Sequence, residues 1–445
     1  MPPAHRTKDT HLNDTARRPR RHHATPVRHG RQRTPSAFGA ILKTLAVVLA
    51  VALVRVGSVA AYAINNLAQQ VSANAVDISG GEDAPPAPPL LGAFEGGFNL
   101  LVVGTDNDPN QGDSFGERDA TLNDVNLLLH VSADHKNAVA VSFPRDLIID
   151  HPECTGPDGT EYGEAYSEPI NNAMGRGGLP CVVRTVESLT GLSIPYAGLV
   201  SFNAVVQMTD AIGGVTICLT DAFDDPYIPL TLPAGYSEIS GANALGFLRS
   251  RHGVGDGSDL GRISSQQQYL SSLMRKVKSD STLTDLGKLY SLGTVVANNV
   301  QLSSTLTSLD TMISMAQALR TIDLDNIVFV QYPGATGDPN FPGKVMPMTD
   351  AADELFALIS ADQPFTLGEG SQGVGTVADP NAAAPVDPAV PVDPSVPVDP
   401  SVPVDPAAPA APDGAAPETP TAAGPTVLDG VTGQTAEQAT CAVPN

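Results

Sequence analysis

The stretch Phe98-Asn-Leu-Leu-Val-Val-Gly-Thr-Asp106 decides the fold class of this chain, because a short apolar run ends directly in a carboxylate. Runs of roughly four to eight apolar residues bounded by turn-forming residues are typical of buried strands. A second run extends from Asp124 to Val131, and a third extends from Asn137 to Phe143, where Pro144 ends it. The pattern predicts that the globular part of the chain begins with three strands.

Helical patterns follow these strands and alternate with two more strands. We expect strands at 215–219 and 327–332, and helices at 185–192, 202–212, 240–249, 264–278, 284–298, 306–320 and 351–359. This alternation indicates an α/β domain whose sheet is largely covered by helices. The pattern leaves the order of the strands open.

The chain around this domain divides into segments of different composition. Residues 1–37 are rich in arginine, histidine and proline and are predicted to be a disordered cytoplasmic tail. Residues 38–64 are apolar, residues 65–95 form a polar stalk, and residues 96–362 form the globular domain. Residues 363–445 contain a Pro/Val/Asp repeat and are predicted to be a disordered, acidic tail.

The apolar segment 38–64 is long enough to cross a bilayer of roughly 30 Å. Basic sequence before it and acidic sequence after it predict a single-pass signal anchor with the N-terminus in the cytoplasm and the main domain outside. Lys43 reaches back to the inner surface, and Arg55 reaches the outer headgroups or thins the bilayer. The alternative is a signal peptide cleaved after Ala61-Tyr-Ala63.

The charge is distributed unevenly along the chain. The formal net charge is −23, and beyond residue 64 there are 14 lysines and arginines against 46 aspartates and glutamates. This balance argues against nucleic acid as a partner of the distal part, because phosphate backbones need a cationic surface.

Four cysteines, Cys154, Cys181, Cys218 and Cys441, allow three pairings. Disulfides are chemically allowed outside the membrane. We favour Cys154–Cys181, because these two cysteines bracket a Gly/Pro/Glu-rich loop that has little else to hold it. The partners of the other two are left open.

An arginine cluster stands out in the acidic half of the chain. Arg249-Ser-Arg251-His252 is followed by Asp259-Leu-Gly-Arg262 and by Gln266-Gln-Gln268. The planar guanidinium group matches phosphate and carboxylate oxygens two at a time, so the cluster is interpreted as an anion site. The alternative is a helix face whose arginines pair with local carboxylates.

Several carboxylates are candidates for a divalent cation. Asp106 follows the first strand and Asp124 opens the second, and ligands of open α/β sheets gather at the carboxyl ends of strands. Mg²⁺ is usually held by one or two carboxylates plus substrate phosphates. Asp119 lies close enough in sequence to share this role, and Asp106 as a plain turn residue is the alternative. Arg145 follows Pro144, which turns it toward the edge of the sheet.

These motifs together resemble the LytR–CpsA–Psr family of cell-wall glycopolymer ligases, in its actinobacterial type. The resemblance covers about residues 98–280 and rests on the following motifs, in order: Asn99-Leu-Leu-Val-Val-Gly-Thr-Asp106, Ser142-Phe-Pro-Arg-Asp146, Ile170-Asn-Asn-Ala173 with Gly177-Gly178, residues 203–214, Ser240 to His252, and Asp259 to Gln268. The resemblance implies an α-β-α sandwich with a mixed central sheet, an α/β fold.

The resemblance also implies roles for individual residues. Arg145, Arg249, Arg251 and Arg262 would hold a pyrophosphate, supported by Asp259 and Gln266, while Asp106 and Asp124 would bind Mg²⁺. Asp106, Asp124, Arg145 and Arg262 would form the catalytic group, and a hydrophobic tunnel would take the lipid.

Two positions depart from the family pattern. The family usually has an arginine two residues before the second aspartate, where this chain has Leu122. Arg118 is the candidate to replace it, with Asp119 sharing the metal. The family's lysine before Ile-Asn is Pro169 here.

We therefore expect a phosphotransferase that attaches glycopolymers from polyprenyl-pyrophosphate carriers to peptidoglycan. The alternatives are a polyprenyl-pyrophosphate hydrolase, and a non-catalytic protein that binds polyprenyl phosphate or the wall. The polymer, the lipid length, the acceptor hydroxyl and the oligomeric state are not specified by the sequence.

Overall fold

The run that opens the domain forms strand β1 (Phe98–Thr105) of a seven-stranded mixed sheet. The computed structural model describes residues 37–79, 94–107, 121–279, 286–382 and 425–445. Arg118, Asp119 and most of the repeat region lie outside these residues. The helices are α1 (Ala37–Ala73), α2 (Ala173–Thr190), α3 (Phe202–Ile212), α4 (Gly241–Arg249), α5 (Asp259–Ser279), α6 (Leu286–Asn299), α7 (Leu309–Thr321) and α8 (Thr349–Ser360).

The large sheet has the strand order β13-β8-β1-β2-β3-β14-β20. Its other strands are β2 (Asn123–Val131), β3 (Ala138–Phe143), β8 (Tyr196–Ser201), β13 (Val300–Leu302), β14 (Ile327–Gln331) and β20 (Gly433–Thr435). β1 pairs antiparallel with β2 and parallel with β8, and β3 pairs antiparallel with β2 and parallel with β14. Four strands, β1, β3, β8 and β14, therefore run in the same direction.

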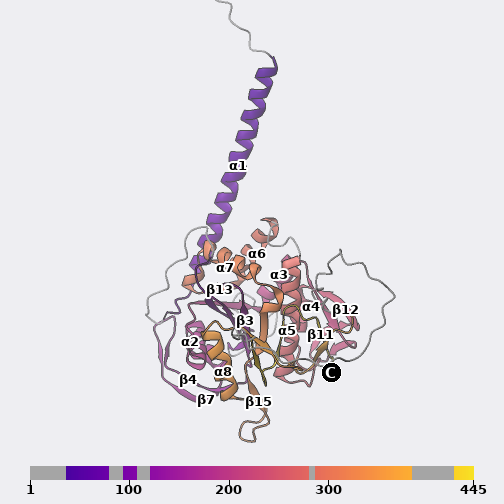
Figure 1. Cartoon of the computed structure of the whole chain (residues 1–445). Coiled ribbons are helices and arrows are strands. Elements are labelled where there is room, and N and C mark those ends of the chain that lie inside the picture. Colours follow the sequence, from indigo (N-terminus) through magenta and orange to yellow (C-terminus); the bar gives the residue numbers. More distant parts are fainter. Residues whose placement is uncertain (1–36, 80–93, 108–120, 280–285, 383–424) are drawn as a thin grey trace, which may run out of the picture. The chain divides into compact units, whose positions relative to one another are not determined.

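Both faces of this sheet are buried, which explains the continuous apolar runs of its strands. Leu101 and Val141 face a core cluster that includes α2 and α8, while Phe98 and Ala140 face a cluster that includes α7. Figure 1 shows the sheet between these helices, with α2 and α8 on one side and α6 and α7 on the other. Full burial of a large apolar side chain such as Leu101 contributes roughly 1.5–3 kcal/mol. The predicted sandwich with a mixed sheet is confirmed.

Local signals in the sequence account for the ends of the helices. The hydroxyl of Ser201 accepts a hydrogen bond from the backbone N–H of Ala204 (3.2 Å) and caps α3, and Gly213 ends the helix with φ of 85°. Gly191 ends α2 in the same left-handed conformation. Glycine adopts this conformation without steric cost. Helix α3 therefore stops where the sequence predicts, while α2, predicted at 185–192, begins at Ala173 and ends at Thr190.

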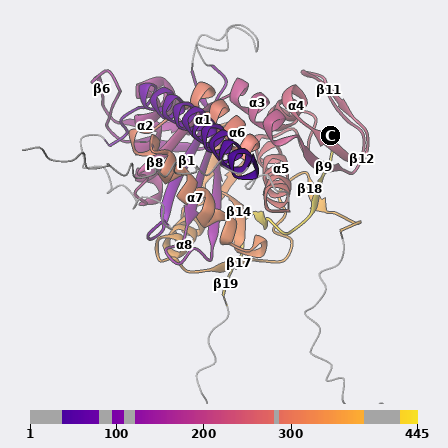
Figure 2. The ribbon, with the colours of Figure 1, turned by 90° about the horizontal axis from the view of Figure 1, so that it is seen from above.

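A smaller module with its own core lies at one end of the large sheet (Figures 1 and 2). It holds the four-stranded sheet β12-β9-β21-β18, formed by β9 (Val215–Leu219), β12 (Gly235–Ile239), β18 (Thr376–Ala378) and β21 (Thr440–Ala442). The hairpin β10 (Phe223–Asp225) and β11 (Ile228–Leu232) and the helices α4 and α5 pack against it. Tyr269 of α5 is buried in this core.

Small two-stranded pairs complete the domain: β4 (Ile148–His151) with β7 (Ala165–Pro169), β5 (Cys154–Thr155) with β6 (Glu161–Tyr162), β15 (Gly334–Thr336) with β16 (Val345–Pro347), and β17 (Phe365–Leu367) with β19 (Thr426–Leu428). The predicted disulfide Cys154–Cys181 joins the loop of β5 to α2. Gly177 of α2 allows this close approach, because a Cβ there would lie 2.4 Å from the Cys181 sulfur.

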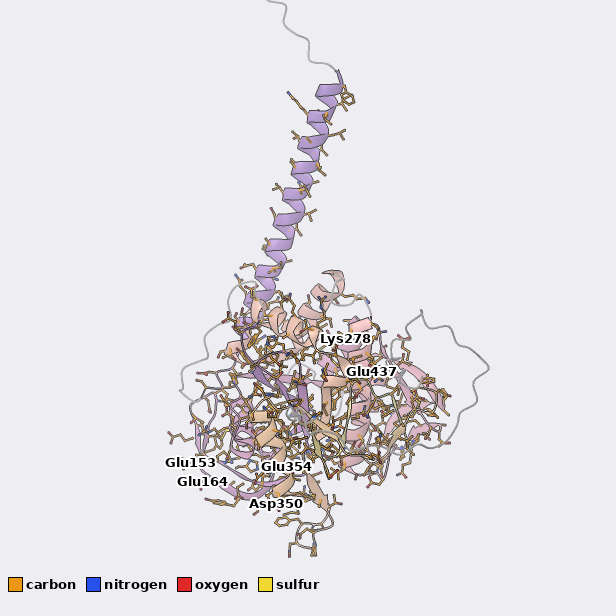
Figure 3. The ribbon with its side chains drawn as sticks, viewed as in Figure 1. Glu153, Glu164, Lys278, Asp350, Glu354 and Glu437 are labelled. Carbon is orange, nitrogen blue, oxygen red and sulfur yellow. A yellow bond between two sulfur atoms is a disulfide. The ribbon has the colours of Figure 1, made fainter. Side chains whose placement is uncertain are left out.

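Helix α1 extends beyond the predicted apolar segment. Its side chains from Ile41 to Val59 are exposed where the structure describes them, as Figure 3 shows. One candidate membrane span, Ile41–Ala73, is found among the described residues. The helix continues to Ala73, and Leu67 and Val71 are buried in the core of the domain. Residues 65–79 thus differ from the predicted stalk, because apolar residues at a spacing of four give this last part of the helix a face to bury.

The C-terminal region differs from the prediction of a tail that is disordered from residue 363 onward. Residues 363–382 contain β17 and β18, and residues 425–445 contain β19, β20 and β21. β20 pairs with β14, and Cys441 of β21 forms a disulfide with Cys218 of β9. The short strands have little periodicity of their own, so tertiary pairing decides their structure. The repeat itself, at 383–424, lies outside the described residues.

Candidate functional site

Four of the predicted site residues, Asp106, Asp124, Arg145 and Arg262, lie at one edge of the large sheet, where β1, β3, β8 and β14 end. Asp106 follows β1 directly, and Pro144 turns Arg145 away from the end of β3. The antiparallel β2 begins at the same edge and carries Asp124. Ligands of α/β sheets gather beyond the carboxyl ends of the strands, so this edge is the place where a site is expected.

A β-bulge places Asp124. Thr105 pairs with Asn123 and Gly104 pairs with Val125, so Asp124 is an extra residue on β2 without a partner on β1. A bulge bends the strand and turns a side chain out of its regular alternation. The carboxylate of Asp124 is thereby directed to Arg145, with 2.7 Å between Oδ1 and Nη1.

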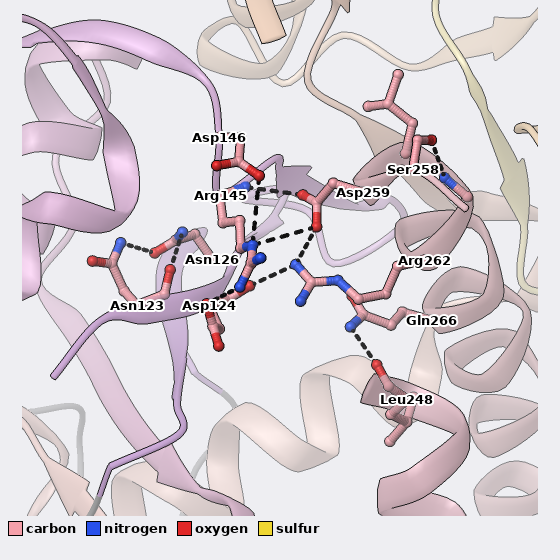
Figure 4. Close-up of polar contacts among 12 residues, drawn as sticks. Asn123, Asp124, Asn126, Arg145, Asp146, Leu248, Ser258, Asp259, Arg262 and Gln266 are labelled. Atoms are coloured by element: carbon pink, nitrogen blue, oxygen red, sulfur yellow. Dashed lines mark hydrogen bonds and ion pairs between the residues drawn. The ribbon is translucent and has the colours of Figure 1, made fainter. Parts of the chain in front are cut away.

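Arg145 is the centre of the charge cluster in Figure 4. Its Nε lies 3.6 Å from Asp146 and 3.8 Å from Asp259, in addition to the contact with Asp124. The backbone N–H of Arg145 donates to Asp259 (3.2 Å), which fixes the turn after Pro144. The three carboxylates raise the pKa of Arg145 against the opposing effect of burial, which is the largest single influence.

Arg262 enters the same cluster from the first turn of α5. Its Nη2 lies 2.7 Å from Asp259 Oδ1 and donates to the backbone carbonyl of Asp124 (2.9 Å). The residue is only 6% exposed. Burial lowers the pKa of Arg262, and the charges of Arg145 and Arg251 lower it further, while Asp259 and Asp124 raise it.

Arg249 and Arg251 approach the same edge from the end of α4. The guanidinium carbon of Arg249 lies 4.3 Å from the ring centroid of Phe202, which follows the last residue of β8. Arg251 is close enough to Arg262 to lower its pKa. The buried Nε atoms of Arg251 and Arg262 have no hydrogen-bond partner among the described residues. Buried guanidinium donors without partners are suited to an added anion.

Gln266 contacts the backbone rather than another arginine. Its Nε2 donates to the carbonyl of Leu248 (2.9 Å), next to Arg249, and so connects α5 to the end of α4. It can support the arginines only by holding this part of α4 in place.

Lys344 also belongs to the cluster, although no local sequence pattern points to it. Its Nζ lies 2.6 Å from Asp146 Oδ1. It directly precedes β16 (Val345–Pro347), almost two hundred positions away from Asp146 in sequence, and it stands in no motif. Two arginines and one lysine therefore face three aspartates, and their formal charges cancel. The six residues are Arg145, Arg262, Lys344, Asp124, Asp146 and Asp259. The structure thus shows the local ion pairs that are one of the two alternatives, while the anion site stays a prediction.

A second missed group supports the start of β2. The amide of Asn123 donates to Asn126 Oδ1 (2.7 Å) and to the carbonyl of Ile170 (3.2 Å), and it accepts from the backbone N–H of Met174 (3.1 Å). All of these atoms are buried. The Ile170-Asn-Asn-Ala173 motif therefore holds the strand that carries Asp124.

Two carboxylates of the site have the chemistry that a divalent cation requires. Asp106 is 3% exposed and Asp124 is 8% exposed. Asp106 directly follows β1 and Asp124 lies on the neighbouring strand β2, where Thr105 pairs with Asn123. Carboxylate oxygens are ligands that Mg²⁺ prefers, so these two side chains fit the ion. Arg118 and Asp119 lie outside the described residues.

Comparison with known proteins identifies one family. The model of the LytR_cpsA_psr family matches residues 52–355. Among curated proteins, the chain is 28% identical over 276 residues to "Cell wall biosynthesis protein LcpA" of Corynebacterium glutamicum, which covers 55% of this chain and 52% of that protein. It is 32% identical over 264 residues to "Probable cell wall biosynthesis protein LcpB" of the same organism, covering 57% of each.

A third relative carries a more specific name. The "Polyisoprenyl-teichoic acid--peptidoglycan teichoic acid transferase TagU" of Oceanobacillus iheyensis is 30% identical over 218 residues, covering 48% of this chain and 62% of the relative. The chain thus spans about half the length of the curated relatives that it matches. Among solved structures, "TagT bound to LIIa-WTA" aligns with a TM-score of 0.47 at 21% identity, covering 64% of this chain and 98% of that one.

Proposed function

Because the chain belongs to the LytR_cpsA_psr family, we propose that it is a phosphotransferase that moves a glycopolymer from a polyprenyl-pyrophosphate carrier to peptidoglycan. One observation carries the proposal: Arg145 and Arg262, from distant parts of the sequence, converge on Asp124 and Asp259 at the carboxyl edge of the sheet. The names of the relatives refer to cell-wall biosynthesis and to transfer of teichoic acid to peptidoglycan.

The arginines would bind the pyrophosphate and stabilise the charge that builds up on it. Transfer breaks the phosphoanhydride bond and forms a phosphodiester with an acceptor hydroxyl, while the polyprenyl phosphate leaves. Guanidinium groups fixed in advance stabilise this charge without reorganisation at the moment of reaction. Asp259 keeps Arg145 and Arg262 in place, since it contacts both.

Asp106 and Asp124 are the residues that would hold Mg²⁺. Bound there, the ion would neutralise phosphate charge and act as a Lewis acid. Asp124 also contacts Arg145, so the same carboxylate would connect the cation site with the arginines. A carboxylate of this pair is suited to accept the proton of the attacking hydroxyl.

Helix α1 would anchor the enzyme at the membrane, where its lipid-linked substrate is found. We propose that the N-terminus is cytoplasmic and the main domain lies outside, in agreement with the basic residues before the helix and the two disulfides after it.

Asp106→Asn tests the proposal in the full-length chain. With a polyprenyl pyrophosphate, Mg²⁺ and a muramyl acceptor, we expect the wild type to form the phosphodiester product. The variant should lose about a hundredfold or more of this turnover, as is typical when a group that stabilises transition-state charge is removed. Its affinity for the lipid pyrophosphate should change by less than about tenfold, because the arginines remain.

Glu354→Gln is the matched control, since Glu354 is an exposed carboxylate on α8 (Figure 3). It should leave turnover unchanged. Phosphate release without a phosphodiester product would identify a hydrolase. Tight binding of the lipid with no turnover by the wild type would identify a non-catalytic binder. This is the second candidate function, because Leu122 stands where the family usually has an arginine.

A further inference from the structure

The loop between α4 and α5, residues 250–258, carries Arg251 and joins Arg249 to Asp259; we name it the arginine loop. We propose that the C-terminal residues Val443–Asn445 are positioning residues that hold the arginine loop in the geometry needed to bind the substrate's phosphates. This inference rests on the proposed function. It assigns a role to a part of the chain beyond residues 52–355, which the family model matches.

The backbones of three segments lie side by side at the arginine loop. Gly255 N–H donates to the carbonyl of Val443 (2.8 Å), and Val443 N–H donates to the carbonyl of Gly375 (2.8 Å). Pro444 forms an isolated antiparallel bridge with Val254. The approach requires glycine, because a Cβ at Gly375 would lie 2.4 Å from the Cα of Gly255. The C-terminal residues are thus fitted directly against the loop.

Asn445 extends this contact toward the arginines. Its backbone N–H donates to the carbonyl of Gly253 (3.3 Å), and its side-chain amide donates to the carbonyl of His252 (3.3 Å). His252 follows Arg251 in sequence. Two hydrogen bonds from one residue therefore restrain the backbone next to an arginine of the site.

The C-terminal residues are themselves fixed to the rest of the module. β21 is linked by Cys441 to Cys218, and Thr220 N–H donates to the carbonyl of Ala442 (3.0 Å). Gln268 of α5 donates to the carbonyls of Cys218 (2.7 Å) and Thr440 (2.9 Å). Since α5 also carries Arg262, these contacts connect the C-terminal residues to the helix that holds this arginine of the cluster.

The opposite side of the arginine loop is held by Asp225. Its Oδ2 accepts from the hydroxyl of Ser250 (2.6 Å) and from the backbone N–H of Gly253 (3.1 Å). Gly253 is therefore held from two directions, by β10 and by the C-terminal residues. A loop restrained in its bound conformation loses less entropy when the ligand binds, which increases affinity.

The test uses the full-length chain and geranyl pyrophosphate with Mg²⁺ as the probe. Asn445→Ala and a deletion of Pro444 and Asn445 should each raise the dissociation constant of the probe by about three- to tenfold. This is the effect of losing roughly one neutral hydrogen bond. Asn445→Gln keeps the amide donor and should restore part of the affinity. The melting temperature of Asn445→Ala should not fall below that of the control.

Val427→Ala is the control, because Val427 belongs to the same C-terminal region, is 56% exposed and pairs with β17 instead of the loop. Unchanged affinity in Asn445→Ala and in the deletion would overturn the inference. A loss of affinity that parallels the fall in melting temperature across all variants would also overturn the inference. If the wild type itself fails to bind the probe, the proposed function fails, which is a separate result.

Discussion

Arg262 shows how a single residue combines structural and chemical roles. It is almost fully buried, and its Nη2 contacts a carboxylate of its own helix and the backbone of β2. A buried charge is stable only when it is paired and hydrogen-bonded. The same residue therefore connects α5 to the large sheet and presents a guanidinium group to the site.

Arg262→Lys tests whether these two roles need the guanidinium group or only a positive charge. Lysine keeps the positive charge but not the planar group, so we expect a loss of about 1–3 kcal/mol in the free energy of unfolding and a clear loss of affinity for pyrophosphate. Urea unfolding and calorimetry measure the two effects. The control is Arg184→Lys, at a pair with Glu187 in which the arginine side chain is 59% exposed. It should stay within about 0.5 kcal/mol of the wild type. Equal effects at both positions would refute the role given to Arg262.

Among the elements, the β10–β11 hairpin acts on the site from a distance through Asp225. This carboxylate is buried, and it accepts hydrogen bonds from Ser250, Tyr227 and Gly253. Burial alone would raise the pKa of Asp225, but these hydrogen bonds and the charge of His252 outweigh it and lower the pKa below the ordinary 3.8.

This pKa predicts how stability depends on pH. Because the folded pKa is lower than the unfolded one, ionised Asp225 stabilises the fold fully above the unfolded pKa, and this contribution is lost as the pH falls through the folded pKa. We expect Asp225→Asn to cost about 2 kcal/mol at about pH 5 and clearly less at about pH 3. Denaturant unfolding at both pH values checks this. A cost that does not depend on pH would mean that the carboxylate charge has no role.

The sequence predicts the regular elements of the large sheet and its helices, because their periodicity and end signals agree with the tertiary structure. The strands around Phe98, Asp124 and Ala138 and the helix stop at Gly213 occur where the sequence places them. The same signals bring Arg145 and Asp106 to one edge of the sheet.

Other parts of the site depend on contacts that no local pattern encodes. Lys344 reaches Asp146 across a large distance in sequence, and Asp225 stands in a strand of three residues. The bulge at Asp124 follows from its register with β1, which the sequence of β2 alone does not specify. Such features depend on pairing between distant segments and become visible only in the folded chain.

At the scale of the whole molecule, the folded unit begins and ends where side chains are buried in a core, and not where the composition of the sequence changes. The second compact unit begins at Tyr62, within α1, and includes Leu67 and Val71 of one core cluster. At the other end, residues 425–445 supply strands to two sheets. The repeat is thus an insertion between two parts of one domain.

A truncation series follows from these boundaries. A chain of residues 62–445 should unfold cooperatively. A chain of residues 94–445 should be less stable by more than about 4 kcal/mol, because it lacks three buried apolar side chains, Leu67, Val71 and Val76, and burial of each contributes roughly 1.5–3 kcal/mol. Urea unfolding of both chains gives the comparison. Equal midpoints would show that the end of α1 does not contribute to the core.

The bond between Cys218 and Cys441 determines what happens when a protease cleaves the chain between residues 383 and 424. The cut would separate the polypeptide into two pieces, but the smaller one would remain covalently attached and paired with β9 and β14. On a denaturing gel the nicked protein would migrate as a single species without reductant and as two fragments with it. Digestion of the repeat would thus leave the two parts of the folded domain joined by this disulfide.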